Sequence, residues 1–354
     1  MGLGALTLPG CGVLQGSLRT ITDMGGREVH VPEKISRVFC SNPIGTVDLY
    51  ALAPDTLAGW NFRPTGDNRK YIPEVYLNLP PLGVWMGAGA TPNDEEIVRQ
   101  DPDAILCYWT VDEVGCQMAD KVRDETGVPV ILVDYDIRTT PDMFRFVGQL
   151  IGADDRAEEL ARYCEEKIEV IRAHVAKIPE SNRKSIYLAQ GHGGLSTDPA
   201  GSMHVVDALE LLGTGNVADM PGAEGQGMGM PTVNLEQIIT WNPDAVLVSE
   251  YSMSDSETSD LYNEILGDAD WASVPCVRAG KVYRLPQSPF AWFGRPPSVM
   301  RVLGCMLLLK VLYPEYARDI DLPAETRAFY ERFLRIDLSD RGLSDILETA
   351  GITV

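Results

Sequence analysis

The sequence predicts an α/β protein of two lobes that one long helix joins. Residues 93–106 and 234–247 repeat one pattern, in which Asn, Glu, Ile, Pro, Asp and Ala recur in register. In each copy we expect the Asn to cap a short helix, the Glu to lie in its first turn, and Pro-Asp to lead into a buried strand. Between the copies, residues 156–178 carry one apolar stripe at helical spacing, which predicts a helix of about 35 Å. Two equivalent units on either side of this helix predict two lobes.

Strands and helices alternate along both predicted lobes. The first lobe opens with two short runs around Gly25 and Gly26 that predict a hairpin. The strands expected after it span 35–40, 57–60, 104–107 and 128–133, and the helices span 45–52 and 95–100. In the second lobe the expected strands span 185–189, 245–248 and 282–285, and the helices span 205–212 and 299–312. This alternation is typical of parallel sheets that helices cover on both faces.

Length and charge limit the class of protein. A chain of 354 residues is long enough for two domains. Its 45% hydrophobic and 23% charged residues are typical of a globular protein. Acidic residues number 51 against 30 basic ones, for a net charge of −21. A surface of this sign repels phosphate backbones, so we expect no nucleic-acid partner.

The N-terminus carries a short apolar run that ends in Leu8-Pro9-Gly10-Cys11. This run resembles the lipobox of bacterial lipoproteins and predicts lipidation of Cys11. Two features depart from the pattern, since Pro9 is unusual there and no basic residue precedes the run. The alternative is an unstructured N-terminus with an accidental Cys. No apolar stretch reaches the roughly 18 residues that a membrane-spanning helix needs.

The seven Cys residues form no CxxC pair, so the sequence contains neither a zinc ribbon nor a redox motif. Four of them lie in apolar or strand-like runs and are expected to be small buried hydrophobes: Cys40, Cys107, Cys164 and Cys305. The sequence leaves open a bridge between Cys107 and Cys116.

Several blocks together resemble the iron-complex class of ABC transporter substrate-binding proteins, which captures iron siderophores, haem or cobalamin. The repeated segments are similar to that family's recurring pattern, and so are residues 52–59, 207–213 and 271–283. The resemblance implies two Rossmann-like lobes with mainly parallel sheets joined by one long helix, the helical-backbone periplasmic binding protein fold. We expect four segments: a lipoprotein signal remnant and tether (1–18), an N-terminal lobe (19–141), a connecting helical segment (142–180) and a C-terminal lobe (181–354).

The same resemblance implies an extracytoplasmic solute-binding protein, anchored to the cell membrane only by a lipid. It would deliver a small iron chelate of the siderophore type to ABC permease subunits. Haem, cobalamin or an oxyanion such as molybdate or tungstate are the alternatives. Glu95 and Glu236, one in each repeat, would meet the permease, or would only favour the helix N-termini on which they lie. We expect a monomer without a cofactor.

Ligand contacts are expected from the loops that follow strands, where this fold holds its ligand between the lobes. The candidates are polar, charged and aromatic: in the first lobe Ser41, Asn42, Asn61, Phe62, Arg63, Trp85, Tyr108 and Trp109, and in the second lobe Gln190, His192, Glu250, Tyr251, Phe290, Trp292, Phe293 and Arg295. Aromatic rings offer rigid contact area, and Arg binds carboxylate or catecholate oxygens. The Trp residues are equally compatible with core positions, and Arg63 and Arg295 with surface salt bridges.

Other chemistries find less support. His192 is a candidate to ligate iron or haem, with a solvated loop His as the alternative. A bare zinc or manganese ion needs three or four His or carboxylate ligands, and the chain has four His, of which His174 falls on the predicted connecting helix. The sequence contains no GxSxG, P-loop or HExxH motif and no GxGxxG after a strand. We therefore expect a binding protein and no enzyme.

Overall fold

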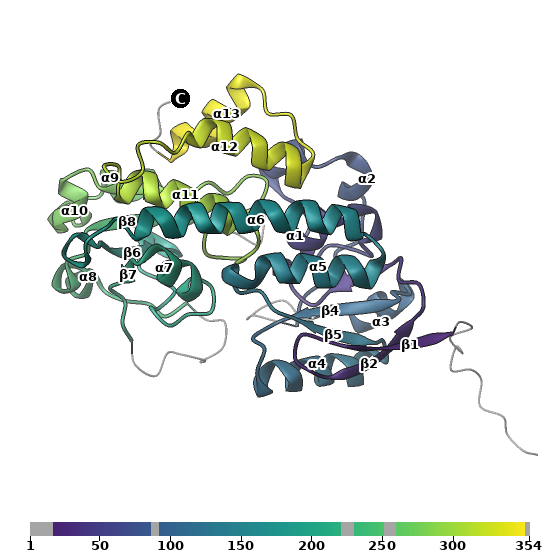
Figure 1. Ribbon diagram of the computed structural model, residues 1–354. Coiled ribbons are helices and arrows are strands. Elements are labelled where there is room, and N and C mark those ends of the chain that lie inside the picture. Colours follow the sequence, from purple (N-terminus) through teal and green to yellow (C-terminus); the bar gives the residue numbers. More distant parts are fainter. Residues whose placement is uncertain (1–16, 86–91, 221–229, 251–259, 351–354) are drawn as a thin grey trace, which may run out of the picture.

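The protein folds into two α/β lobes with one long helix running across both (Figure 1). The structure is a computed structural model and describes residues 17–85, 92–220, 230–250 and 260–350. In these residues an antiparallel hairpin precedes two parallel sheets, which confirms the predicted fold class. No helix in these ranges is both long enough and apolar enough to cross a membrane. Cys11 lies outside the described residues.

The N-terminal lobe contains the predicted hairpin and a three-stranded sheet. The hairpin pairs β1 (Leu18–Thr22) with β2 (Glu28–Pro32), and the sheet has the order β3 (Val38–Cys40), β4 (Ala104–Tyr108), β5 (Val130–Val133). The helices of this lobe are α1 (Pro43–Leu52), α2 (Glu74–Leu77), α3 (Asp94–Arg99) and α4 (Glu113–Thr126). The strand predicted over 57–60 is wrong, because Leu57 and Trp60 make only isolated bridges.

The C-terminal lobe contains a four-stranded parallel sheet of order β7-β6-β8-β9. Its strands are β6 (Ser185–Ala189), β7 (Gly215–Asn216), β8 (Ala245–Val248) and β9 (Val282–Arg284). Its helices are α7 (Val206–Leu212), α8 (Leu235–Trp241), α9 (Leu261–Gly267), α10 (Pro275–Arg278), α11 (Met300–Leu312), α12 (Leu322–Phe329) and α13 (Asp340–Thr349). The predicted strands and helices of this lobe are confirmed to within one residue at each end.

The connecting segment contains two antiparallel helices where the sequence predicts one. The first, α5 (Thr140–Ile151), ends at Gly152, whose φ of 74° favours glycine. The second, α6 (Asp154–Val175), runs back along it. A Cβ on Gly148 would lie 2.2 Å from that of Ala157, so glycine lets the two helices approach closely. Because α6 packs against α1 and α5 and also against α7 and α11, it crosses both lobes as predicted (Figure 1).

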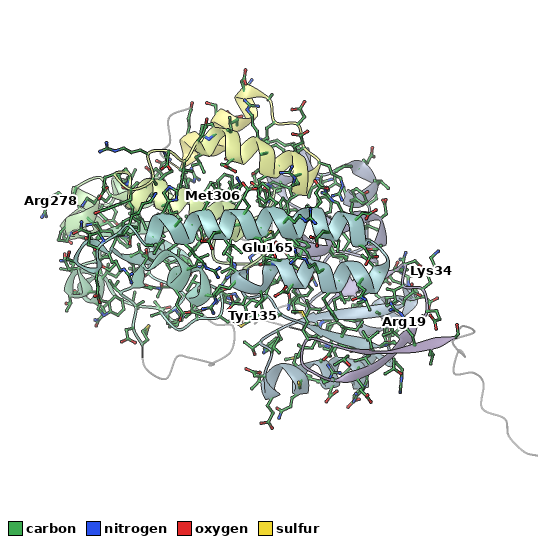
Figure 2. The ribbon with its side chains drawn as sticks, viewed as in Figure 1. Arg19, Lys34, Tyr135, Glu165, Arg278 and Met306 are labelled. Carbon is green, nitrogen blue, oxygen red and sulfur yellow. The ribbon has the colours of Figure 1, made fainter. Side chains whose placement is uncertain are left out.

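Alternate side chains of each strand face opposite sides of the sheet. In both lobes one side faces a core that the lobes share, and the other side faces an outer core of its own lobe. On β4, Leu106 faces the shared core, whereas Ile105 faces the outer helices of the N-terminal lobe. On β6, Leu188 faces the same shared core, whereas Tyr187 faces the outer helices of its own lobe. Figure 2 shows the side chains that fill this interior above and below α6. One continuous apolar core beneath α6 therefore couples the lobes and limits how far they can separate.

The repeat produces matching local structure in both lobes. The side chain of Asn93 caps α3 by accepting from the backbone N of Glu96 (3.1 Å), and that of Asn234 caps α8 by accepting from the backbone N of Gln237 (2.8 Å). Both repeats also leave the helix through a left-handed residue, Asp101 with φ 49° in the first repeat and its counterpart with φ 50° in the second. The predicted helix caps are therefore confirmed.

The cysteines of the described residues are all free thiols. The four that the sequence places in apolar runs are buried, as predicted. The bridge left open between Cys107 and Cys116 is absent, since both side chains are free. Burial raises the pKa of the Cys107 thiol to about 12, so this group is an inert part of the outer core.

Candidate ligand site

The polar candidates of the N-terminal lobe form a closed hydrogen-bond network. Asn42 caps α1 and donates from Nδ2 to the carbonyl oxygen of Tyr108 (2.7 Å). Asn61 donates to two backbone carbonyls, each at 2.9 Å, and accepts from the hydroxyl of Thr46. Ser41 is buried beside Asn42. These side chains bond to the chain itself, so they hold the strand-end loops in shape.

Most aromatic candidates lie in the cores. Tyr108, Trp292 and Phe293 are fully buried, because the loops that carry them turn back onto the shared core. Trp85 is buried against the outer core of its lobe and donates from Nε1 to Glu125 (2.7 Å). These four rings therefore pack inside the protein and leave little or no surface for a ligand.

The remaining aromatic candidates are partly accessible. The ring of Phe290 packs edge-on against Tyr50, with centroids 5.6 Å apart, and lies 6.2 Å from Trp60. This contact joins a loop of the C-terminal lobe to α1 of the N-terminal lobe. Trp109 and Phe62 are half-buried, and Trp109 packs against the outer core. Phe62, Trp109 and Phe290 therefore each keep part of their surface accessible.

Some charged candidates are exposed to solvent, and others are held in ion pairs. Arg63 and His192 are exposed. Glu250 pairs with Arg284 at 2.6 Å, which fixes its carboxylate to the end of β9. Tyr251 lies outside the described residues.

Two polar residues continue neighbouring strands of the C-terminal sheet and point to the same face. Gln190 follows β6 and Ser249 follows β8, and the backbone N of Ser249 donates to the carbonyl of Ala189 (3.0 Å). Leu188 on β6 pairs with Leu247 on β8, and both face the shared core. Side chains two residues apart on a strand share a face, so Gln190 and Ser249 point to the shared core as well. Both side chains are buried, with 1% exposed.

Gln190 and Ser249 present polar atoms that bond to nothing in the described part of the chain. The Oε1 of Gln190 accepts from the backbone N of Asp198 (2.9 Å), which fixes the orientation of the amide and leaves Nε2 as a buried donor. The hydroxyl of Ser249 is likewise buried without a partner. Unpaired buried donors are uncommon because each costs free energy comparable to a lost hydrogen bond.

Arg295 lies beside these residues and is held by a buried carboxylate. Its Nε and Nη2 donate to the two carboxylate oxygens of Asp198 at 3.0 and 2.7 Å. The side chain of Asp198 is fully buried. Burial alone would raise the pKa of Asp198, but hydrogen bonds from Arg295 and Ser202 and the positive charge of Arg295 bring it below its ordinary value. Asp198 therefore stays ionised and orients the guanidinium.

His204 completes the group. Its ring is buried, and neither Nδ1 nor Nε2 has a hydrogen-bond partner within the described residues. Burial lowers the pKa of His204 to about 4, against the charge of Asp198, so the ring is neutral at physiological pH. We refer to Gln190, His204 and Ser249 as the donor cluster.

Sequence reasoning found Gln190 and Arg295 of this group but missed Asp198, His204 and Ser249. Ser249 comes directly after a predicted strand, so the rule that identified Glu250 also applies to it. His204 and Asp198 lie in the connection between β6 and α7, for which the sequence carries no strand or helix signal. Their relation to Arg295, about a hundred residues later in the chain, depends on tertiary structure.

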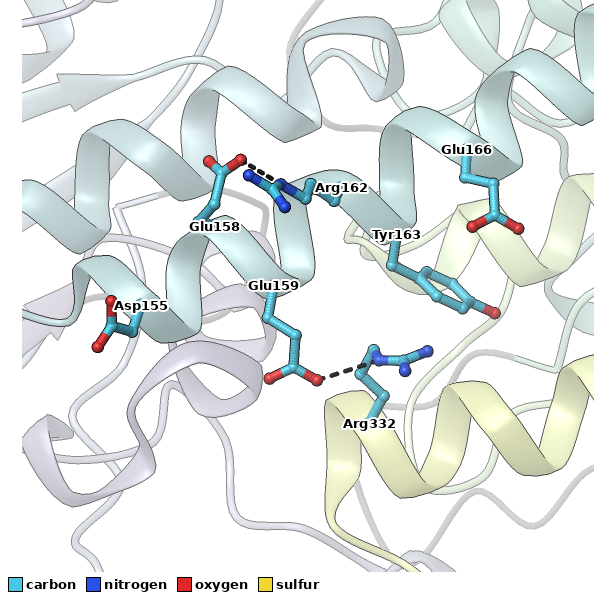
Figure 3. Close-up of a pocket in the computed structure, with 7 residues that line it drawn as sticks. All are labelled: Asp155, Glu158, Glu159, Arg162, Tyr163, Glu166 and Arg332. Carbon is cyan, nitrogen blue, oxygen red and sulfur yellow. Dashed lines mark hydrogen bonds and ion pairs between the residues drawn. The ribbon is translucent and has the colours of Figure 1, made fainter.

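A separate hollow of about 460 Å³ lies on the outer face of α6, away from the strand ends (Figure 3). Seven residues line it: Asp155, Glu158, Glu159, Arg162, Tyr163, Glu166 and Arg332. Its charges already pair with each other, as Arg162 does with Glu158 (2.7 Å) and Arg332 with Glu159 (3.1 Å). Ion pairs of this exposure are common on protein surfaces and indicate no ligand.

Within the part of the chain that the structure describes, no three His, Cys, Asp or Glu side chains gather closely enough to hold a metal ion. His174 pairs instead with Asp319 (2.9 Å). Of the remaining His residues, His30 contacts Thr20 in the hairpin.

The repeat helices present matching surfaces. Glu95 on α3 and Glu236 on α8 are exposed, as the docking hypothesis requires. One turn further on, Val98 and Ile239 occupy equivalent positions and are 49% and 36% exposed. Residues three apart share a helix face, so each lobe exposes a carboxylate next to an aliphatic side chain.

Residues 84–289 match the family described as periplasmic binding protein. This match covers more than half of the 354 residues, and the chain belongs to that family. It is therefore an extracytoplasmic substrate-binding protein of an ABC importer, not an enzyme, with a small-molecule ligand and permease subunits as partners.

Known proteins are similar over most of the chain. The solved structure of an ABC transporter solute binding protein from Sulfurospirillum deleyianum is 29% identical and has a TM-score of 0.81, covering 93% of this chain and 99% of that one. The molybdate-binding protein MolA of Haemophilus influenzae is 24% identical over 340 residues, or 90% of this chain and 91% of MolA. The Fe(3+) dicitrate-binding periplasmic protein FecB of Escherichia coli is 24% identical over 217 residues, or 56% of this chain and 63% of FecB.

Proposed function

We propose that the chain captures a small anionic, metal-containing solute between its two lobes and delivers it to the permease of an ABC importer. The observation that carries this proposal is the donor cluster beside Arg295, at the carboxyl ends of β6 and β8. Open parallel sheets bind their ligands at this edge. Hydrogens that lack protein acceptors there favour an electron-rich ligand.

Two classes of anionic ligand fit this site. A ferric chelate of the siderophore type is what the family resemblance implies, and FecB is named for binding Fe(3+) dicitrate. A molybdate-like oxyanion is the second candidate, and the similarity to MolA extends over nearly the whole of both chains. Haem and cobalamin receive less support, because a flat macrocycle needs aromatic surface and Trp85, Tyr108 and Trp292 are buried.

A titration of the purified protein distinguishes these ligands. Ferric citrate, a ferric siderophore, haem, cobalamin and sodium molybdate would each be added while tryptophan fluorescence is recorded. Trp271 is a suitable reporter, because its Nε1 donates to the carbonyl of Gly193 (3.1 Å) in the loop after Gln190. We expect one anionic class to saturate the signal at one ligand per chain. A saturable response to cobalamin alone would contradict the proposal that the site binds anions.

We further propose that Glu95 and Glu236 meet cationic pockets on two permease subunits, with Val98 and Ile239 in contact beside them. Removing both carboxylates, as E95A/E236A, should weaken docking by roughly 10- to 100-fold, because each then leaves a permease cation unpaired. Binding to the cognate permease in proteoliposomes measures this effect. Ligand affinity should not change, since both carboxylates are exposed whereas the donor cluster is buried.

The matched control for docking is E264A, which removes an exposed glutamate from the first turn of α9, outside the repeats. It should dock as the unaltered protein does. Equal loss in E264A and in the double variant would mean that overall negative charge, and not the repeat helices, attracts the permease.

The attachment to the membrane is also a proposal. Lipidation of Cys11 would place the protein at the outer face of the cell membrane, next to its permease. The expected product is a chain whose first residue is Cys11, carrying the lipid. Mass spectrometry of the membrane fraction would detect it, and gel filtration of the delipidated protein would test the expected monomer.

A further inference from the structure

The donor cluster differs from the polar groups around it in that its hydrogens have no acceptor among the described residues. In the N-terminal lobe, the strand-end side chains Asn42 and Asn61 bond to backbone carbonyls and to neighbouring hydroxyls. At the same edge of the C-terminal sheet, the amide of Gln190 and the hydroxyl of Ser249 end in unpaired buried atoms. His204 leaves both ring nitrogens unpaired. Three such groups in one region indicate a ligand-binding role, because folding alone gains nothing from them.

The three groups surround one ion pair. Gln190 bonds to the backbone of Asp198, and Asp198 holds Arg295. His204 interacts electrostatically with both members of that pair. Ser249 lies near the residue that precedes Arg295, since a Cβ added to Gly294 would stand 3.9 Å from its hydroxyl. Glycine at 294, with φ 82°, thus brings backbone rather than a side chain next to the hydroxyl.

The carboxylate and amide oxygens of this region already accept hydrogen bonds from the protein. Both carboxylate oxygens of Asp198 accept from Arg295, and Oδ1 also accepts from Ser202 (2.8 Å). The Oε1 of Gln190 accepts from the backbone. The Nε2 of Gln190 and the guanidinium of Arg295 can only donate. The hydroxyl of Ser249 and the neutral ring of His204 each offer one donor and at least one acceptor. An oxyanion can therefore take a hydrogen bond from each of these groups.

We infer that the donor cluster of Gln190, His204 and Ser249 is a subsite for a small tetrahedral metal oxyanion. This inference rests on the proposed function and narrows its ligand from metal-containing anions in general to molybdate or tungstate. Gln190 and Ser249 donate from the strand ends, His204 donates from the connection to α7, and Asp198 fixes Arg295 beside them. The subsite uses neutral donors for most of its contacts, since the charge of Arg295 is balanced by Asp198.

Two substitutions test the inference without breaking any existing bond. Ser249→Ala and His204→Phe remove polar atoms that have no partner in the described chain, so the ligand-free variants should unfold at the same or a higher temperature than the unaltered protein. Each should nevertheless bind sodium molybdate roughly 10- to 100-fold more weakly by calorimetry.

The matched control is Ser185→Ala, at the opposite end of β6. Its hydroxyl already donates to Asp244 (3.2 Å), so this variant should lose a little stability and keep full affinity. Molybdate binding that is unchanged in S249A and H204F would overturn the subsite. Saturable binding of ferric citrate, with none of molybdate or tungstate, would also overturn it while leaving the proposed function intact.

Discussion

Replacing Arg301 by methionine should destabilise the protein by about 3–5 kcal/mol, although the residue is remote from any surface. The side chain of Arg301 is 1% exposed and pairs with Asp207, whose side chain is 5% exposed. It also donates to the carbonyl oxygen of Tyr135 (2.7 Å). Methionine fills a similar volume but leaves the carboxylate of Asp207 buried without its cation, which is the costly part of breaking such a pair.

The position of this pair makes it a link between the lobes. Arg301 lies in the first turn of α11 and Asp207 in the first turn of α7, both in the C-terminal lobe. Tyr135 and Ile137 belong to the segment after β5, and the backbone N of Ile137 donates to Asp207 (2.7 Å). Figure 2 shows Tyr135 beneath α6, where this segment approaches the second lobe. The pair of Arg301 and Asp207 therefore holds the segment that contains Tyr135 and Ile137 against the C-terminal lobe.

Chemical denaturation of R301M measures the expected loss, and two variants sharpen the result. The double variant R301M/D207L removes both charges and should recover part of the stability, because neither charge is then buried alone. The recovery is not complete, since the backbone N of Ile137 and the carbonyl of Tyr135 lose their partners. R123A is the control for losing an arginine, since Arg123 is 48% exposed and its pairs lie at the surface. It should cost no more than about 1 kcal/mol. A loss of similar size in R123A and R301M would contradict the role given to the buried pair.

Features that depend on local pattern could be predicted from the sequence. The repeat predicts both helix caps, because Asn93 and Asn234 act through neighbours only three residues away. The strands β4, β6 and β8 were predictable because each is a buried apolar run bounded by turn residues. Arg301 shows the limit of such patterns, since a lone arginine in the apolar run of α11 carries no sign of its distant partner Asp207.

The candidate site was predictable only in outline. The rule that ligands meet strand-end loops led to Gln190 and Arg295, but the same rule selected Tyr108 and Trp292, which the shared core buries. Whether a loop side chain turns inward depends on packing between segments far apart in the chain. His204 was missed for a related reason, because an unpaired buried group is recognised only when its surroundings are known.

Replacing Asp48 by asparagine should stabilise the protein at high pH. Asp48 lies inside α1, is 3% exposed, and accepts from the backbone N of Val299 at the start of α11 (2.8 Å). Burial raises the pKa of Asp48 to about 7, although the hydrogen bond from Val299 and the charge of Arg301 both lower it. Asparagine keeps an acceptor for Val299 and never ionises. It should add roughly 2–4 kcal/mol at pH 8, where the native carboxylate is charged in a buried position.

The stabilisation expected in D48N should depend on pH, because the contribution of Asp48 to the free energy of unfolding does. The pKa of Asp48 in the folded protein, about 7, is above its unfolded value of 3.8, so the contribution of Asp48 is fully present below about pH 4 and is lost as pH rises through 7. His204 acts in the opposite direction, because its lowered pKa, about 4 against 6.5, costs stability as pH falls through this range. Both proteins contain His204, so its effect drops out when the free energy of unfolding of the unaltered protein is subtracted from that of D48N.

That difference, measured by denaturation from pH 4 to 8, should therefore rise from near zero to its maximum above pH 7. The control D345N changes an exposed aspartate on α13 and should show no such rise. A difference that stays flat with pH would mean that Asp48 is ionised in the folded protein throughout, held by Arg301. In that case R301M should lower stability further at pH 8 than at pH 5, because the same arginine would then support two buried carboxylates, Asp48 and Asp207.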